Sequence, residues 1–348
     1  MTRRTTVRGF GRSVPGRANR DEAGSSGPGR LRSGWWGSLV VAVVVGMVVP
    51  VQARVNGELG RRLEDGLAAA LLSFAGGLLL LIVFVLVSAR LRRALGVLRI
   101  AVRDEGFPRW YLLAGTFGAV FALAQSTLTL LTGVAVFTVA LLSGQAIGGL
   151  VVDARGIGGG VRRRPERHRL IGVGVILVAA VISALPGFAN TPDPVTVALP
   201  AVGASATGFL IGLQQAMNGA TSAVSGSPAA ATWVNFWGGS LFLVVAWGVK
   251  VLLRGPAEHP LPTDWWLYLG GPCGLVFIGF SALLVRRLGV LLLGMALTAG
   301  QLVSSLVLDL LVPSGNHAPS VFTVVAAVLA FVAVGITSLR PRDRHPRR

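Results

Sequence analysis

Uncharged apolar stretches of about 20 residues recur along the chain, and this recurrence limits the possible folds more than any other feature. A helix of about 20 apolar residues is what the hydrocarbon core of a bilayer requires. Ten such stretches follow one another at residues 35–53, 67–88, 110–131, 134–152, 170–188, 195–217, 228–249, 265–285, 288–308 and 319–338. The chain is therefore predicted to be an all-α integral membrane protein with ten transmembrane helices.

The composition agrees with this prediction. Hydrophobic residues make up 53% of the 348 residues, charged residues only 13%, and the mean hydropathy is +0.69. A soluble protein carries about 25% charged residues. A single cysteine, Cys273, excludes a disulfide within the chain, and all four histidines lie outside the apolar stretches. We therefore expect no metal site and no cofactor.

The basic residues predict the topology. The formal net charge is +18, but the arginines lie between the apolar stretches rather than on one basic face, so we expect no nucleic-acid partner. If the N-terminus is cytoplasmic, 27 of the 32 Lys and Arg residues fall on the cytoplasmic side. Both termini are then cytoplasmic in a multi-pass protein of the bacterial inner membrane. Residues 1–33 are predicted to be a disordered basic tail, and residues 341–348 a second basic tail.

One long apolar segment must contain a turn. The stretch from Trp110 to Val152 would be about 64 Å long as a single helix, which is twice the thickness of the hydrocarbon core. We therefore expect it to fold back on itself, with the turn at Thr132-Gly133.

The chain repeats itself. In the first half PVQARVN is followed by SFAGG, RWYLLAG and GQAIGGLVVD, and in the second half GLQQAMN is followed by NFWGG, DWWLYLG and GQLVSSLVLD. The offsets are 162 residues for the first two pairs, then 155 and 156. These motifs occupy residues 50–56, 73–77, 109–115 and 144–153, answered by residues 212–218, 235–239, 264–270 and 300–309.

The repeat unit predicts an inverted architecture. Each unit, residues 34–189 and 190–340, contains five spans, so the second copy must begin on the opposite side of the membrane. Inverted repeats are common in secondary transporters, because two equivalent halves can exchange inward-open and outward-open packings around one site. Helix breakers at matching positions of the halves, here Pro50 and Gly212, point to such a site. The alternative is a simple kink or, for Gly212, the packing of a small residue.

These motifs resemble a known family. Gln52 and Asn56 followed by SFAGG, an aromatic pair opening the third span, and GQ with an aspartate further along the fourth resemble the YdcZ-like group of inner-membrane exporters. The group belongs to the drug/metabolite transporter superfamily, which includes the EamA-like fold. The resemblance covers residues 35–339 and implies the fold and a role in export, but no particular cargo.

Repeated polar residues inside the spans are the candidate binding residues, because a polar group is costly in lipid and tends to face the protein interior. Gln52 and Asn56 lie four residues apart on one helix face, as do Gln214 and Asn218. Each pair could bind a substrate or could form hydrogen bonds between helices.

A second set of repeated residues lies in the fourth span and its counterpart. Gln145 and Gln301 lie about 12 Å along the helix from Asp153 and Asp309, which mark the ends of these spans. The glutamines are our first choice for substrate contact. The helix dipole disfavours an anion at these ends, so the aspartates are candidates for gating or proton coupling, or else are solvated at the interface. The small-residue motif beginning at Gly144 favours close packing of helices inside the fold. A helix contact in a homodimer is the alternative.

Three functions compete at this point. A secondary transporter that exports a small neutral or zwitterionic metabolite agrees with the inverted repeat and with the lack of an acid in the first span. Proton coupling stays open. An intramembrane enzyme would need a nucleophile with a base, or a metal cluster, inside the spans, and the sequence offers neither. A lipid-translocating or scaffold protein of the same architecture is the alternative, with membrane lipids as partners.

Overall fold

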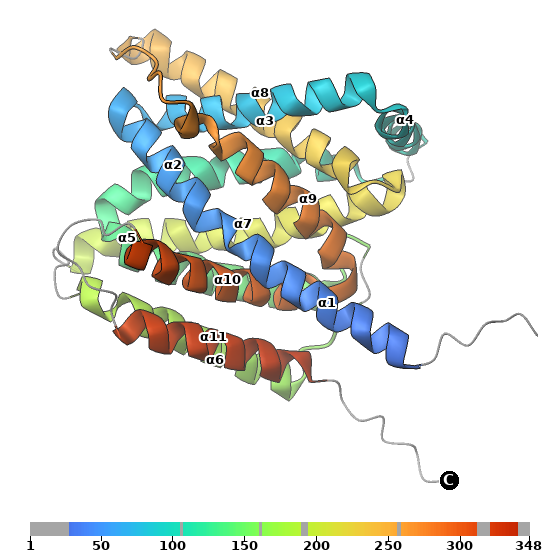
Figure 1. Ribbon diagram of the computed structural model, residues 1–348, viewed down its shortest axis with the longest axis vertical. Coiled ribbons are helices and arrows are strands. Elements are labelled where there is room, and N and C mark those ends of the chain that lie inside the picture. Colours follow the sequence, from blue (N-terminus) through green and yellow to red (C-terminus); the bar gives the residue numbers. More distant parts are fainter. Residues whose placement is uncertain are drawn as a thin grey trace, which may run out of the picture.

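The computed structural model describes residues 28–104, 107–159, 162–188, 194–255, 259–311 and 321–339. Within these ranges the chain is all-helical, without strands. The helices are α1 (Pro28–Gly46), α2 (Val48–Leu63), α3 (Gly66–Val87), α4 (Ala89–Arg103), α5 (Ala114–Arg155), α6 (Arg167–Phe188), α7 (Pro194–Ser225), α8 (Pro228–Arg254), α9 (Gly270–Leu288), α10 (Val290–Leu311) and α11 (Val321–Ser338), with short 3-10 helices at Arg109–Leu113 and Trp265–Tyr268 (Figure 1).

Five segments of the described chain are long and apolar enough to cross a membrane, which makes the protein multi-pass. They are Trp35–Leu63, Gly66–Val87, Pro228–Arg254, Trp265–Leu288 and Val290–Leu308. The remaining predicted spans also fall on helices, namely on α5, which holds two of them, and on α6, α7 and α11. The number of ten stays a prediction.

The ends of the chain differ in part from the prediction. Helix α1 begins at Pro28, so residues 28–33 of the predicted disordered tail are helical. Residues 1–27 and the C-terminal tail at 341–348 lie outside the described residues. In Figure 1 the first turn of α1, the last turn of α11 and helix α4 all lie at the right-hand end of the molecule.

Helix α5 doubles back, as its length requires, but without a break in its helical backbone. The expected turn at Thr132-Gly133 lies inside α5, which is helical from Ala114 to Arg155. A straight helix would separate Gly118 from Gly149 by about 46 Å. Yet a methyl group on Gly118 would lie 2.5 Å from Nε2 of Gln214, and one on Gly212 would lie 3.1 Å from the backbone nitrogen of Gly149. The two arms of α5 therefore lie against the same part of α7.

Helix α4 occupies a segment that the sequence analysis treated as a loop. Its first turn is capped by Ser88, whose Oγ accepts a hydrogen bond from the backbone nitrogen of Leu91 at 3.2 Å. Leu91, Ala94 and Leu98 are buried on one face, and its arginines occupy the exposed face. The helix is thus amphipathic and packs along the edge of the bundle rather than crossing it.

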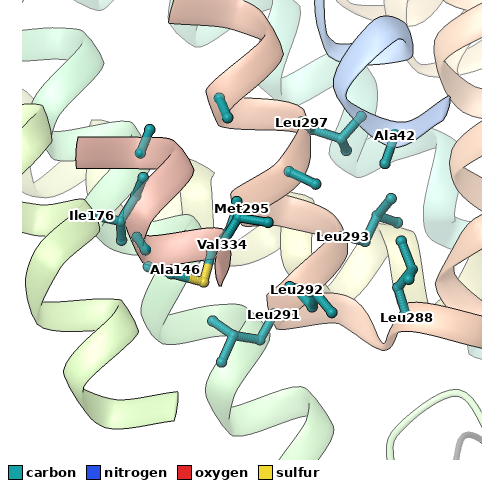
Figure 2. Close-up of a cluster of buried hydrophobic side chains, with 14 of the residues drawn as sticks. Ala42, Ala146, Ile176, Leu288, Leu291, Leu292, Leu293, Met295, Leu297 and Val334 are labelled. Carbon is teal, nitrogen blue, oxygen red and sulfur yellow. The ribbon is translucent and has the colours of Figure 1, made fainter. Parts of the chain in front are cut away.

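Helix α10 forms the centre of the largest hydrophobic core. From Val290 to Leu302 each of its apolar side chains is at most 6% exposed. The next residue, Val303, is half-buried. Figure 2 shows these side chains meeting residues of α1, α5, α6, α9 and α11, among them Ala42, Ala146 and Ile176. A helix that is apolar on all sides and enclosed by its neighbours can place a polar side chain such as Gln301 inside the bundle.

Glycines bring backbones of the two halves into direct contact, and they do so in matching pairs. A methyl group on Gly300 would overlap the carbonyl oxygen of Val43, and a methyl group on Gly144 would overlap that of Ser205. Gly144 and Gly300 are equivalent in the repeat, and so are Val43 and Ser205. Each half therefore offers the other the same contact.

The same reciprocity occurs between α3 and α8. The ring of Phe236 covers Gly77, and the ring of Phe74 covers Gly239, so that the two phenylalanines also meet at a centroid distance of 5.2 Å. Phe74 and Phe236 are equivalent in the repeat, as are the two glycines. The motifs SFAGG and NFWGG thus pack against one another.

We predict that Gly300→Ala and Gly144→Ala each lower the free energy of unfolding by about 1–3 kcal/mol, because the added methyl group meets a backbone carbonyl that cannot move alone. The measurement is thermal unfolding of the purified protein in detergent. Gly76→Ala is the matched control, since a methyl group there meets nothing within 4 Å. Equal midpoints for all three variants would contradict the close helix contacts.

Candidate functional site

A cavity of about 80 Å³ lies inside the helix bundle, between helices of both halves of the chain. Its walls combine amide side chains with phenylalanine rings. Its lining residues are Val49, Gln52, Ala53, Asn56, Ala70, Ser73, Phe74, Gly118, Phe121, Ala122, Gln125, Leu141, Gln145, Ile211, Gln214, Phe236, Gly274, Phe277, Ile278 and Gln301. We call this space the amide cavity.

Five of the six predicted binding residues line the amide cavity. Gln52 and Asn56 come from α2, Gln145 from α5, Gln214 from α7 and Gln301 from α10. Because α2 and the second arm of α5 belong to the first repeat, and α7 and α10 to the second, both halves contribute equivalent glutamines. The structure therefore brings together residues that lie up to 249 positions apart in the sequence.

Asn218, the sixth candidate, is not among the residues that line the cavity. It is buried, and its Oδ1 accepts a hydrogen bond from Nδ2 of Asn235 on α8 at 3.3 Å. This bond joins α7 to α8. In the second half the asparagine is thus engaged in helix packing, whereas its counterpart Asn56 faces the cavity.

The polar groups of the cavity include a hydrogen-bond acceptor that has no partner among the described residues. Nε2 of Gln52 donates to the carbonyl oxygen of Gly270 at 3.1 Å, but the buried Oδ1 of Asn56 accepts no hydrogen bond from the described residues. A buried polar atom without a partner costs about 1–3 kcal/mol. A ligand with an N–H or O–H group beside Asn56 would remove this cost.

Two groups of lining residues were not predicted from the sequence. Gln125 is one of them, because it is not a repeated polar residue of the same type: its counterpart in the second half is Ser281. The other group consists of the rings of Phe74, Phe121, Phe236 and Phe277. Two of these belong to the repeated motifs SFAGG and NFWGG, so the repeat contained a signal for them.

The two predicted helix breakers behave differently. The helix is interrupted at Met47, between α1 and α2, and Pro50 lies in the first turn of α2, where its missing N–H leaves the carbonyl of Gly46 without its usual donor. The expectation of a break at Gly212 is wrong, because α7 continues through it from Pro194 to Ser225. Gly212 instead lets α7 approach Gly148 and Gly149 of α5.

Asp153 is buried and joins three helices. One carboxylate oxygen pairs with Nη2 of Arg169 on α6 at 2.5 Å, and the carboxylate accepts hydrogen bonds from the backbone nitrogens of Val290 at 2.7 Å and Leu291 at 3.3 Å. Those two N–H groups form the start of α10, where a negative charge is favourable. Asp153 is therefore a capping residue that ties α5 and α6 to α10.

Asp309, the equivalent aspartate, lies in the last turn of α10. Its side chain lies outside the described parts of the structure. Its role in gating or proton coupling stays a prediction.

Lys250, at the end of α8, carries a charge that the structure shows to be compensated. Its Nζ lies 2.5 Å from Oδ2 of Asp65, which also caps the start of α3 by accepting from the N–H groups of the first turn. Burial alone would raise the pKa of Asp65, but the ion pair and these N–H groups hold it below its usual value. This contribution to stability is present at neutral pH and is lost as the pH falls through the folded-state pKa.

The described residues that line the amide cavity include hydrogen-bond donors and acceptors but no ionisable side chain. Nor do the described residues bring three His, Cys, Asp or Glu side chains close enough to hold a metal ion. The arrangement can bind an uncharged polar group between amides and an apolar portion against phenylalanine rings.

A multi-pass bundle of helices with a polar cavity between them has the features of a membrane transporter. The family comparison agrees. The chain belongs to the family described as "Putative inner membrane exporter, YdcZ", whose model matches residues 38–182 and again residues 199–337. The protein is thus a multi-pass inner-membrane protein of an exporter family of the drug/metabolite transporter type, and the internal repeat is a repeat of this family's unit.

Comparison with solved structures supports the fold alone. Nineteen solved chains match, and one of them, described as "Crystal structure of protein", aligns with a TM-score of 0.62 and 17% sequence identity. The alignment covers 88% of this chain and 96% of that chain. No curated protein matches the sequence.

We predict that Asp153→Asn lowers the free energy of unfolding at pH 7 by about 3–5 kcal/mol, because it leaves the buried guanidinium of Arg169 without its counter-charge. Thermal and denaturant unfolding in detergent measure this loss. In the Arg169→Met background the same substitution should cost at least about 1 kcal/mol less. Asp104→Asn, at the exposed end of α4, is the control. Equal stability of Asp153→Asn and Asp104→Asn would show that the ion pair of Asp153 with Arg169 does not stabilise the fold.

Proposed function

We propose that the protein is a secondary transporter that exports a small neutral or zwitterionic metabolite by alternating access around the amide cavity. The observation that carries this proposal is the convergence of equivalent glutamines from both repeats, Gln52 with Gln214 and Gln145 with Gln301, on one cavity. A site shared by two equivalent halves is what an alternating-access transporter requires.

The proposal includes ten spans arranged as two inverted five-helix repeats. Its support is the reciprocity of the helix contacts. Gly118 lies against the side chain of Gln214, and its counterpart Gly274 lies against that of Gln52, in the same way that Gly144 and Gly300 exchange contacts with the opposite halves. Such an exchange is expected of halves related by a two-fold axis. With five spans in each half, this axis would lie in the membrane plane.

The distribution of charge supports cytoplasmic termini. Helix α4 and the arginines at 162–169 and 286–287 lie in the connections that the topology assigns to the cytoplasm. The opposite set of connections holds the pairs of Asp65 with Lys250 and of Arg62 with Asp264, in which positive charges are balanced by acids. An excess of arginine on one side is the expected signature of the cytoplasmic face.

Asp153 is suited to act as a cytoplasmic gate. It connects α5 and α6 of the first half to the start of α10 in the second half. Separating the halves on this side would break the ion pair with Arg169 and uncap α10. In this proposal Asp309 has the corresponding role on the opposite side. Proton coupling through either aspartate and a homodimer remain further hypotheses.

The chemistry of the cavity defines the class of substrate. Its described lining residues offer amide donors and acceptors and four phenylalanine rings but no charge, and the acceptor on Asn56 has no partner among the described residues. Such a lining favours a molecule with a hydroxyl, amide or amine donor and a small apolar part. A cavity of about 80 Å³ is smaller than the 300–1,000 Å³ typical of ligand sites, so binding requires the halves to separate.

The proposal predicts that a soluble metabolite of this class raises the thermal unfolding midpoint of the purified protein, because a ligand that binds only the folded state stabilises it. The measurement is a thermal-unfolding screen of metabolites and lipids in detergent. Stabilisation should be lost in the Gln145→Ala/Gln301→Ala variant.

Two adjacent glutamines of α7 provide a matched control. Gln214 lines the cavity, whereas Gln215 is buried outside it, with neither amide atom hydrogen-bonded to the described residues. Gln214→Leu should raise the ligand concentration needed for half-maximal stabilisation about tenfold or more, and Gln215→Leu should leave this concentration unchanged. Stabilisation by lipids alone, insensitive to these glutamines, would favour the lipid-translocating or scaffold protein instead.

A further inference from the structure

A second cavity, of about 480 Å³, shares no lining residue with the amide cavity, and five of its twelve described lining residues are arginines. It is formed where the segment before α6 meets the turn between α9 and α10, the N-terminal part of α1 and the end of α11. Its lining residues are Trp35, Arg162, Arg163, Arg164, Glu166, His168, Arg169, Arg287, Leu292, Thr337, Ser338 and Leu339. We call it the basic pocket.

Hydrogen bonds hold the arginines of the basic pocket close together. Nη2 of Arg163 donates to the carbonyl oxygen of Arg287 at 3.1 Å, and its Nη1 donates to the carbonyl oxygen of Leu288. Nε of Arg162 donates to the carbonyl oxygen of Ala154 at 2.8 Å. These acceptors are backbone carbonyls of the first and second halves of the chain. The hydrogen bonds therefore hold the guanidinium groups of Arg162 and Arg163 in place at the pocket.

Few acids compensate this charge. Among the described residues that line the pocket, five are arginines and one, Glu166, is a carboxylate. Asp153, which lies behind it, is already engaged with Arg169 and with the start of α10. Like charges held within one cavity repel each other, so a bound anion would stabilise the folded protein.

The start of α6 adds to this imbalance. Its first three residues are Arg167, His168 and Arg169, and its first turn contains no acid. The positive end of the helix dipole disfavours cations at this position and favours an anion, because the first backbone N–H groups also lack partners within the helix. The acid nearest to this helix start is Glu166, which directly precedes it and lies 3.5 Å from Nδ1 of His168.

The basic pocket also has apolar lining residues. These are Trp35, Leu292 and Leu339, together with the hydroxyl-bearing residues Thr337 and Ser338. A cavity lined by both guanidinium groups and apolar side chains fits an amphiphile with a phosphate group. Arginine binds phosphate by two parallel hydrogen bonds, and basic pockets between helices on the cytoplasmic side bind anionic lipid headgroups.

We propose that the basic pocket binds a phosphate-bearing anion, either the headgroup of an anionic phospholipid or a free phosphate compound. The anion would bridge the arginines before α6 and Arg287 at the end of α9, and so would link the first half of the chain to the second beside Asp153. This site is separate from the amide cavity, and the proposal does not depend on the nature of the exported substrate.

The test measures thermal unfolding of the full-length protein in a neutral detergent with three probes, namely phosphatidylglycerol, phosphatidylcholine and inorganic phosphate, at constant ionic strength. We expect saturable stabilisation by phosphatidylglycerol and none by phosphatidylcholine. Arg164→Gln/Arg287→Gln should raise the half-saturating concentration at least about tenfold, because it removes two phosphate contacts. Arg164→Gln alone, at an exposed position, keeps the test valid if the double variant folds poorly.

The control variant is Arg93→Gln/Arg99→Gln, which removes two exposed arginines from α4 and therefore the same net charge. It should respond to phosphatidylglycerol as the unmodified protein does. Saturable stabilisation by inorganic phosphate with the same dependence on Arg164 would identify a soluble phosphate compound as the ligand, and stabilisation by the lipid alone would identify the headgroup. Equal responses of the two double variants, or no stabilisation by either anionic probe, would overturn the proposal.

Discussion

The close approach of helix backbones at glycine residues is the constraint on which the rest of the structure depends. Gly300 against the carbonyl of Val43 and Gly144 against that of Ser205 leave no room for a methyl group. In lipid, helices gain little from burying apolar surface against each other, so tight van der Waals packing has to hold them together. Glycine at these positions brings α1 to α10 and α5 to α7, and the positions of the polar side chains follow from these contacts.

This packing also explains why the amide cavity lies where it does. Gln145 and Gln301 each follow directly after one of these close-packed glycines, so the contact that joins the halves also orients the glutamines. Gln52 and Gln214 are placed by Gly274 and Gly118 in the same manner. The cavity is therefore a product of the interface between the halves. A change in the packing of the halves would change the cavity, which is the property that an alternating-access mechanism uses.

Much of the architecture was predictable from sequence because lipid imposes simple rules on length and polarity. The apolar stretches fall on helices, and the repeat found in the motifs is matched twice by the family model. What depends on packing was less predictable. Gly212 serves close contact instead of a helix break, because this depends on whether a neighbouring backbone is present, here that of Gly149.

The site shows the same division between local and tertiary information. The repeated glutamines were identifiable because repetition marks them in the sequence, whereas Gln125 has Ser281 as its counterpart and was passed over. The partner of Asp153 was also hidden. Arg155 is its neighbour in sequence, but Arg169 is its neighbour in space, because α6 folds back beside the end of α5. Helix α4 has a clear amphipathic period, but its five arginines make it too polar to be predicted as a membrane span.

The central claim is that one cavity between the halves becomes accessible from both sides of the membrane. The most direct measurement places a single cysteine in the cavity, Ala122→Cys in a Cys273→Ser background, and follows its reaction with a membrane-impermeant maleimide applied to either side of oriented membranes. Gly76→Cys, at a position on α3 with no neighbour within 4 Å, is the control. The account predicts that Cys at position 122 reacts from both sides. Reaction from neither side, or from one side only, would contradict it.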